Sequence, residues 1–199
     1  MGQCLGCHHS IAPTRQLPSG SYCLDAGLIR THMETITRNT KIVLVGMPGV
    51  GKSTVGVLLA KVLSRGFVDT DVYIQAHENR RLQDILDKDG RDAFCRVEET
   101  HIARLECTNC VIATGGSVIY SDRAMKYLKT AGVVVYLTLP LDALQQRLTN
   151  LPTRGVVMTP GQDLNHLYEE RDPLYRKYAD VQVNCSGLNH EQVVAAIRK

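Results

Sequence analysis

From residue 41 onward, short apolar runs alternate with longer stretches in which apolar and polar residues are mixed. The apolar runs are nearly continuous and rich in β-branched residues, which is typical of strands buried on both faces of a sheet. We predict five such strands, at residues 42–45, 66–68, 111–113, 133–137 and, more weakly, 181–183.

The stretches between these runs carry apolar residues at helical spacing. We predict helices at residues 52–64, 91–106, 122–130, 141–151, 162–178 and 190–198, and a broken helical region around 72–89. Strands that alternate with helices predict an α/β fold, with a parallel sheet covered by helices on both faces.

The first 38 residues differ from the rest of the chain. They mix Gly, Pro, Ser, Cys and His without a period near 2 or 3.6, which indicates loop or disorder. They contain no apolar core of a signal peptide, and Met33 stands shortly before the first predicted strand. We therefore predict an N-terminal extension at 1–38, either flexible or the product of a misassigned start, and one domain at 39–199.

Composition and charge exclude several classes of protein. The 199 residues are 44% hydrophobic and 22% charged, as in an ordinary soluble globular protein. The net charge of +3 is too small to favour nucleic acid or an anionic membrane as partner, and no apolar run approaches the ~18 residues of a membrane span. Seven cysteines without a secretory signal favour reduced thiols. We expect a cytoplasmic monomer that binds neither nucleic acid nor membrane.

The strongest chemical signal is the segment GMPGVGKS at residues 46–53, a complete GxxxxGK[ST] motif. It lies between a predicted strand and a predicted helix, as the motif requires. Its glycines let the loop curl so that N–H groups point at phosphate oxygens, and the helix N-terminus adds partial positive charge. We predict that Lys52 reaches the β- and γ-phosphates of ATP and that the Ser53 hydroxyl binds Mg²⁺. The predicted ATP-binding residues are Gly46, Gly49, Gly51, Lys52, Ser53 and Thr54.

Two carboxylates follow at the end of the second predicted strand, Asp69 and Asp71. The carboxyl ends of strands are where parallel sheets bind ligands, and residues two apart in an extended segment point the same way. One carboxylate could therefore support the metal while the other accepts a proton from a substrate hydroxyl. The alternative is a pair of solvated acids that cap the next helix.

Over residues 41–199 the chain resembles the shikimate kinase family. The shared motifs are GMPGVGKST at 46–54, FVDTD at 67–71, Phe94 with Glu98, ATGGS at 113–117, Arg154 in a lid-like loop, and ERDPLY at 170–175. The resemblance implies a small P-loop kinase with a five-stranded parallel sheet and a mobile lid. Such kinases move the γ-phosphate of ATP to a hydroxyl of a small metabolite, with Mg²⁺ as cofactor.

For the nucleotide, the resemblance implies three further roles. Asp69 would assist Mg²⁺ through water, Arg147 would stack near adenine, and Arg154 would close on the transferring phosphate. With Lys52 and Asp71, Arg154 completes the predicted catalytic set. A planar, permanently charged guanidinium suits such an anionic partner.

For the acceptor, the resemblance implies that Asp71 contacts and activates the hydroxyl. Gly115 and Gly116 would line the pocket through their backbone, and Arg171 would bind the carboxylate of the acceptor. Without the resemblance, such arginines are ordinary solvated side chains or members of surface ion pairs.

The acceptor site departs from the family pattern. Where the family has an arginine in FRxxE, this chain has Cys95, and Ser117 ends the glycine turn. Arg91, four residues before Cys95, is on the same helix face and could partly replace the missing cation. With one cation fewer and Glu98 without that partner, the site suits a zwitterion better than an anion. We therefore predict homoserine as the acceptor, with Glu98 or an aspartate on its ammonium; the alternative acceptor is shikimate.

Other function classes fit less well. An ATP-binding regulatory module needs no acceptor pocket, and a nucleoside monophosphate kinase needs a larger insertion after the second strand than residues 72–110 provide. The segment Cys4-x-x-Cys7-His8 has the form of a haem attachment site, and with Cys107-x-x-Cys110 it could form a zinc site. We instead expect reduced, mostly inert thiols, and no myristoylation at Gly2 because position 6 is glycine.

Overall fold

The structure is a computed structural model that describes residues 40–130, 132–148, 157 and 161–199. The predicted N-terminal extension at 1–38 lies outside these residues. Most of the predicted lid, including Arg154, lies outside them as well.

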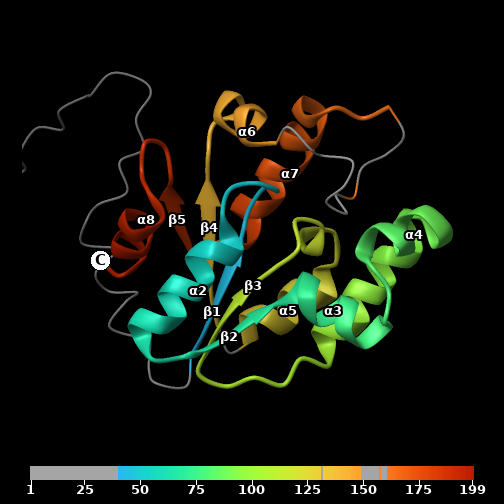
Figure 1. The fold of residues 1–199 in the computed structure, drawn as a ribbon, viewed down its shortest axis with the longest axis horizontal. Helices are drawn as coiled ribbons and strands as arrows, with labels where there is room; N and C mark the ends of the chain where they lie inside the picture. The colour runs from blue at the N-terminus through green and yellow to red at the C-terminus, as the bar shows by residue number, and fades with distance from the viewer. Residues whose placement is uncertain (1–39, 131, 149–156, 158–160) are drawn as a thin grey trace, which may run out of the picture.

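The described residues form one parallel sheet of five strands: β1 (Lys41–Val45), β2 (Gly66–Asp69), β3 (Cys110–Ala113), β4 (Gly132–Thr138) and β5 (Val181–Asn184). Their order is β2-β3-β1-β4-β5, and every neighbouring pair is parallel (Figure 1). The chain thus moves from β1 toward one edge and later, from β3 onward, toward the other, which requires crossover connections through helices.

Helices cover both faces of the sheet (Figure 1). Helices α2 (Lys52–Leu63) and α8 (His190–Ile197) pack together on one face, whereas α4 (Leu82–Ala103), α5 (Asp122–Thr130) and α7 (Leu164–Tyr178) lie on the other. The short helices α3 (Thr70–Glu78), α6 (Leu141–Arg147) and the 3₁₀ turn η1 (Val118–Tyr120) follow strands β2, β4 and β3. The prediction of an α/β fold with a doubly covered parallel sheet is confirmed.

The predicted break in the helical region before residue 91 is confirmed, because Gly90 adopts the non-helical φ 82 and ψ 174 and divides α4 at that point. One detail of the helix prediction is wrong. The helix expected at 141–151 ends at Arg147, since Leu148 already leaves the helical conformation. This boundary depends on a single residue, which helical periodicity over a window does not detect.

Burial follows the position of each strand in the sheet. Strands β1 and β3 are buried along their whole length, as predicted for strands with a neighbour on each side. Strands β2 and β5 are partly exposed because they form the two edges of the sheet. The core is completed by helix residues such as Leu59, and by Tyr175, whose ring stacks on Tyr136 with centroids 5.0 Å apart.

The cysteines differ from the expectation of reduced thiols. Cys107, in the loop before β3, forms a disulfide with Cys110, the first residue of that strand. Between them Asn109 adopts a left-handed φ of 51, and this turn brings the two side chains together. Cys95 and Cys185 are free among the described residues. Because the two sulfurs bond to each other, the disulfide form leaves neither available to zinc.

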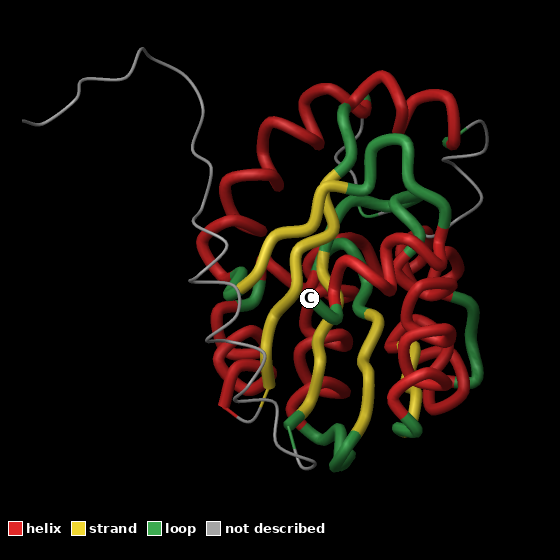
Figure 2. The backbone as a smooth tube through the Cα atoms, turned by 90° about the vertical axis from the view of Figure 1, so that its left-hand side faces the viewer, coloured by secondary structure: helices red, strands yellow, loops and turns green. Residues whose placement is uncertain are grey.

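The loops at the carboxyl ends of the strands gather at one end of the molecule (Figure 2). They include the segment after β1, the start of α3 after β2, and the turn between β3 and η1. The predicted chemistry lies on these same segments.

Candidate active site

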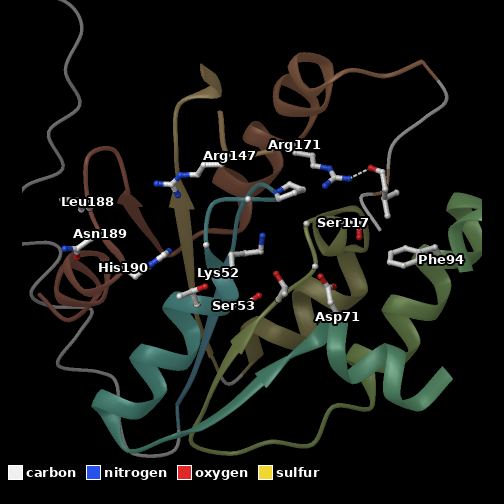
Figure 3. Close-up of a pocket in the computed structure, with 18 residues that line it drawn as sticks. Lys52, Ser53, Asp71, Phe94, Ser117, Arg147, Arg171, Leu188, Asn189 and His190 are labelled. Carbon is white, nitrogen blue, oxygen red and sulfur yellow. Dashed lines mark hydrogen bonds between the residues drawn. The ribbon is translucent and has the colours of Figure 1, made fainter. Parts of the chain in front are cut away.

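A cavity of about 680 Å³ opens at the carboxyl ends of the strands. It runs from Arg147 and His190 at one end, past Lys52 and Ser53, to Asp71 and Phe94 at the other (Figure 3). The predicted residues that line it are Gly49, Gly51, Lys52, Ser53, Thr54, Asp71, Gly115, Gly116, Arg147 and Arg171.

The loop at residues 46–51 turns sharply between β1 and α2. Gly49 and Gly51 adopt φ 81 and 105, a region that favours glycine, and Gly51 is the N-cap of α2. Lys52, in the first turn of that helix, reaches back over the loop. Its Nζ donates to the carbonyls of Gly46 (2.8 Å) and Met47 (3.0 Å).

The ammonium of Lys52 is buried, and desolvation lowers its pKa to about 8, while the nearby Asp71 carboxylate acts in the opposite direction. A buried cation over a curled backbone loop at a helix N-terminus is suited to bind phosphate. Ser53 and Thr54 follow in the same turn and are exposed to the cavity.

Asp69 ends β2 and caps α3. One of its carboxylate oxygens accepts hydrogen bonds from the backbone N–H groups of Asp71 (3.0 Å) and Val72 (3.3 Å). Asp71 therefore belongs to the first turn of α3 and not to an extended segment. The prediction that both carboxylates point the same way from one extended segment is wrong. The capping alternative applies to Asp69, whereas Asp71 enters the cavity from the helix.

The Asp71 carboxyl has an unusual proton affinity. Burial raises its pKa to about 6, the negative charge of Asp69 adds to this effect, and the Lys52 ammonium opposes it. A carboxylate with such a pKa can accept a proton from a bound hydroxyl near neutral pH.

The turn between β3 and η1 forms the floor of the cavity beside Asp71. The Gly115 N–H donates to the Thr70 hydroxyl (3.0 Å), and the Tyr175 hydroxyl donates to the Gly116 carbonyl (2.7 Å). A Cβ on Gly115 would lie 2.5 Å from a Glu98 oxygen and 2.8 Å from an Asp71 oxygen, so only glycine leaves this space open.

Glu98, on α4, is not itself a lining residue of the cavity but lies directly behind this turn. Its side chain is 2% exposed, and one oxygen, Oε2, accepts a hydrogen bond from the Ser117 hydroxyl (2.7 Å). The other oxygen, Oε1, has no hydrogen-bond partner among the described residues. Burial raises the pKa of Glu98 to about 7, and the Ser117 hydrogen bond partly offsets this.

Arg171, on α7, is a fully buried cation with 1% of its surface exposed. It donates to the Tyr120 hydroxyl (3.0 Å) and to the Val157 carbonyl (Figure 3). Its Nη1 lies 2.8 Å from the position of a Cβ on Gly116, so the guanidinium faces the glycine turn. A buried guanidinium at the cavity wall is suited to bind a carboxylate.

Arg91 does not take the place expected for a replacement cation. It forms an ion pair with Glu170 at 3.2 Å, and its guanidinium lies 4.7 Å from the centre of the Tyr120 ring. Neither Arg91 nor Cys95 lines the cavity among the described residues.

The opposite end of the cavity combines Arg147 with the loop after β5. Arg147 is exposed and its guanidinium donates to the Val50 carbonyl at 3.4 Å. Leu188, Asn189 and His190 line the same end, and the His190 Nε2 lies 3.3 Å from the position of a Cβ on Gly51 (Figure 3). We missed these three residues, although their place directly after a parallel strand was a usable signal.

Further lining residues that the sequence did not single out as site residues are Pro48, Phe94, Thr114, Ser117 and Val157. Of the predicted residues that do not line the cavity, Gly46 receives the Lys52 hydrogen bond and Asp69 caps α3. Arg154 lies outside the described residues.

One cavity thus combines a phosphate-binding loop and its Lys52 with the Asp71 carboxylate and the buried Arg171 guanidinium. Together these groups define a P-loop kinase with a small acceptor pocket. A model of the family described as shikimate kinase matches residues 48–199. The chain belongs to the shikimate kinase family, and is therefore an ATP-dependent kinase that transfers a phosphoryl group to an alcohol.

Relatives and solved structures agree with this assignment. The chain is 36% identical over 160 residues to shikimate kinase 2 of Escherichia fergusonii, covering 78% of this chain and 88% of that one. It is 38% identical over 154 residues to the shikimate kinase of Thiobacillus denitrificans, covering 76% and 84%. Shikimate kinase from Acinetobacter baumannii in complex with shikimate matches with a TM-score of 0.75 and 32% identity, over 83% of this chain and 94% of that one.

Other predictions lie beyond these findings. None of the described helices is both long and apolar enough to cross a membrane. The monomeric state and the cytoplasmic location stay predictions.

Proposed function

We propose that this chain phosphorylates a hydroxyl group of shikimate with ATP. The observation that carries the proposal is the buried Arg171 guanidinium, which faces the Gly116 turn of a cavity that also contains Asp71. An acceptor that bears both a carboxylate and a hydroxyl can bind these two groups at once. The 36% and 38% identical relatives, both named shikimate kinases, support shikimate as that acceptor.

At the donor end, ATP binds with its phosphates on the loop at 46–51 and its base near Arg147. The Lys52 ammonium binds the β- and γ-phosphates in exchange for its present carbonyl partners. Neutralising the charge of the transferring group accounts for most of the rate acceleration, because phosphoryl transfer needs positioning and electrostatic stabilisation more than covalent help.

At the acceptor end, Asp71 orients the hydroxyl and takes its proton as the new P–O bond forms. The backbone of Gly115 and Gly116 supports the acceptor, and Arg171 holds its carboxylate. The raised pKa of Asp71, about 6, supports the role of a base because the group remains ionised at neutral pH yet has appreciable proton affinity.

The donor set fits Mg²⁺ as the cofactor. Mg²⁺ prefers oxygen ligands and usually combines one or two protein groups with substrate phosphates and water. The Ser53 hydroxyl opens to the cavity and the Asp69 carboxylate ends the adjacent β2 strand, so these two residues would hold it. When bound, Mg²⁺ supplies positive charge that stabilises the phosphate oxygens.

By resemblance we assign to Arg154 a further positive charge on the transferring phosphate. Closure of the segment that bears it would exclude water, which otherwise competes with the acceptor for the phosphoryl group.

Homoserine is a second candidate acceptor, supported by one specific observation. Position 95 is cysteine, Arg91 pairs with Glu170, and Glu98 keeps one oxygen without a partner among the described residues. A buried carboxylate of this kind can bind an ammonium group. The comparisons favour the alternative, shikimate, over this candidate.

A coupled assay of ADP release decides between the two acceptors. Purified full-length protein is assayed with MgATP and either shikimate or homoserine, and the products are identified by mass spectrometry. We expect turnover of shikimate well above that of homoserine, and no turnover of either compound by Lys52→Ala. Turnover of homoserine alone would refute shikimate as the acceptor, and ATP binding without turnover of either compound would refute both proposals.

A further inference from the structure

The backbone pairing of β2 with β3 stops just before both segments reach the cavity. The last pair of the two strands is Asp69 with Ala113. Beyond it, the chain after β2 turns into helix α3 at Thr70, so the strand backbone does not continue on that side. The chain after β3 runs on into residues 114–117, which line the cavity. The polar groups of this segment therefore need hydrogen-bond partners other than a strand.

The side chain of Thr70 takes the place of the missing strand backbone. Its hydroxyl oxygen accepts a hydrogen bond from the Gly115 N–H at 3.0 Å, across 45 residues of sequence. In a regular parallel ladder a backbone carbonyl would accept from such an N–H. Thr70 is 1% exposed and Gly115 is buried as well, so bulk water does not replace this bond when it is lost.

On its other side the same segment is attached to β1. The N–H and the hydroxyl of Thr114 both donate to the Leu44 carbonyl, at 3.1 and 3.0 Å. The glycine turn thus begins between two supports, the central strand through Thr114 and the first residue of α3 through Thr70. Only the second of these supports comes from the element that carries Asp71.

Thr70 also stands next to the proposed base. It lies between Asp69, the N-cap of α3, and Asp71 in the first turn. A Cβ on Gly115 would be 2.8 Å from Asp71 Oδ1, so the Gly115 backbone lies close to this carboxylate with no side chain between them. The place of the glycine turn therefore sets the space beside the carboxylate, and Thr70 joins the two sides of that space.

We propose that Thr70 is a positioning residue of the phosphoryl transfer, whose hydroxyl holds Gly115 against the start of α3 and so fixes the glycine turn relative to the Asp71 carboxylate. Thr70 does not line the cavity in the part of the chain that the structure describes, so it acts through Gly115 and Asp71. The inference rests on the proposed function, in which Asp71 takes the proton of the bound hydroxyl. Proton transfer to a base requires hydrogen-bond geometry, so a displaced turn lowers turnover.

Thr70→Val tests the role of the hydroxyl, because valine keeps the shape of the side chain and leaves the buried Gly115 N–H without its acceptor. The full chain is assayed with MgATP and the acceptor that the unchanged chain turns over. We expect kcat to fall roughly tenfold, the size of effect that a misplacement of less than 1 Å causes, and KM for ATP to stay unchanged. Thr70→Ala removes the same hydroxyl with a smaller side chain and should show the same loss.

Thr70→Ser tests the same bond by restoring it. Serine keeps a hydroxyl at the same position of the side chain, so kcat should stay within about twofold of the unchanged chain. A loss in Thr70→Ser as large as that in Thr70→Val would mean that the methyl group matters and not the hydroxyl, and would overturn the proposal.

A double substitution separates positioning from general damage to the fold. In a chain that carries Asp71→Asn the base is absent, so the place of the turn relative to it no longer matters. Adding Thr70→Val to that chain should lower the remaining kcat by less than about twofold. An equal tenfold loss with and without Asp71→Asn would show that Thr70 acts independently of the base, and would refute the inference.

Thr138 provides the matched control. It ends β4, its hydroxyl donates to the Val183 carbonyl at 3.4 Å, and it is not among the described residues that line the cavity. Thr138→Val should leave kcat and both KM values unchanged. All kinetics are measured well below the lowest melting temperature of the set. If Thr70→Val keeps the kcat of the unchanged chain, or Thr138→Val loses as much, the inference fails while the proposed function stands. If the unchanged chain phosphorylates neither shikimate nor homoserine, both fail.

Discussion

Three ionisable side chains around the cavity have their proton affinities changed by burial. The pKa of Lys52 falls to about 8, that of Asp71 rises to about 6 and that of Glu98 rises to about 7. In each case desolvation disfavours the charged form, and the neighbouring charges modify the result. Such a cluster is costly to a fold and is common at sites that perform chemistry.

For Asp71 the raised pKa predicts a pH dependence of catalysis. A base must be ionised to accept a proton, so kcat/KM for the acceptor should fall as pH decreases through about 6. Asp71→Asn removes the base while keeping the shape, and should lower kcat roughly a hundredfold or more. Nucleotide affinity, measured by calorimetry, should change little. Equal losses in turnover and in ATP binding would contradict the assigned role.

For Glu98 the raised pKa predicts a pH dependence of stability. In the unfolded chain a glutamate has a pKa of about 4.3, whereas in the folded protein it is about 7. Between these values the folded state holds a proton that the unfolded state has lost, so this group destabilises the fold increasingly as pH rises, and fully above pH 7.

Glu98→Gln removes that ionisation. In thermal unfolding, the melting temperature of Glu98→Gln relative to the unchanged chain should therefore be higher at pH 8 than at pH 5. Glu99→Gln, the same substitution at the partly exposed neighbour on this helix, is measured beside it as the control. A difference that shrinks from pH 5 to pH 8 would rule out the raised pKa.

At the scale of single elements, the position of Asp69 links the end of β2 to the start of α3. Because its carboxylate caps α3 through the N–H groups of Asp71 and Val72, Asp69 also holds the first turn that carries Asp71 into the cavity. One residue can thus serve both the local fold and the metal.

Two substitutions at Asp69 separate these roles. Asp69→Asn keeps a capping oxygen but loses the charge, so stability should be nearly unchanged while the Mg²⁺ concentration needed for half-maximal activity rises. Asp69→Ala loses both, and should in addition lower the free energy of unfolding by about 1 kcal/mol. Denaturant unfolding and a Mg²⁺ titration of activity measure the two effects. Equal stability losses in both variants would show that the cap contributes nothing specific.

Elements were predicted well where the signal is local. The five apolar runs lie within strands β1 to β5, and the GxxxxGK[ST] motif identifies the phosphate loop because glycines and lysine must be adjacent in sequence to form it. The prediction of reduced thiols was wrong for Cys107 and Cys110. It was based on the number of cysteines and on the lack of a secretory signal peptide, which are properties of the whole chain and do not describe a single turn.

The rest of the candidate site depends on contacts between distant segments. The Ser117–Glu98 bond joins residues 19 apart, and the donation from Arg147 to Val50 joins residues 97 apart. Neither follows from periodicity, which reports only on neighbours along one element. The partner of Arg91 was likewise set by α7, through Glu170, rather than by the helix face on which Arg91 lies.

For the whole molecule, the strand order explains why one cavity collects these residues. Strand β1 is central, paired with β3 on one side and β4 on the other, and the chain departs from it in opposite directions. Parallel sheets bind ligands at such a reversal, outside the carboxyl ends of the strands. The loop after β1 therefore lies between two segments of the cavity wall. One is the turn after β3 with Gly115, and the other is helix α6 after β4, which ends at Arg147.

We predict that residues 39–199 form the kinase domain and that residues 1–38 are not needed for its stability or activity. All residues of the described hydrophobic core lie between Ile42 and Ile197, and the family match begins at residue 48. A chain that starts at residue 39 keeps every described strand and helix. We expect it to unfold at the same temperature as the full chain, with the same kcat/KM for the acceptor.

A second truncation makes the test decisive. A chain that starts at residue 46 lacks β1, whose residues are all buried and whose loss leaves β3 and β4 without their shared partner. It should fail to fold, as judged by circular dichroism and by the absence of a cooperative thermal transition. If the chain from residue 39 also lost activity or melted at a lower temperature, residues 1–38 would have to contribute to the kinase, and the proposed domain boundary would be wrong.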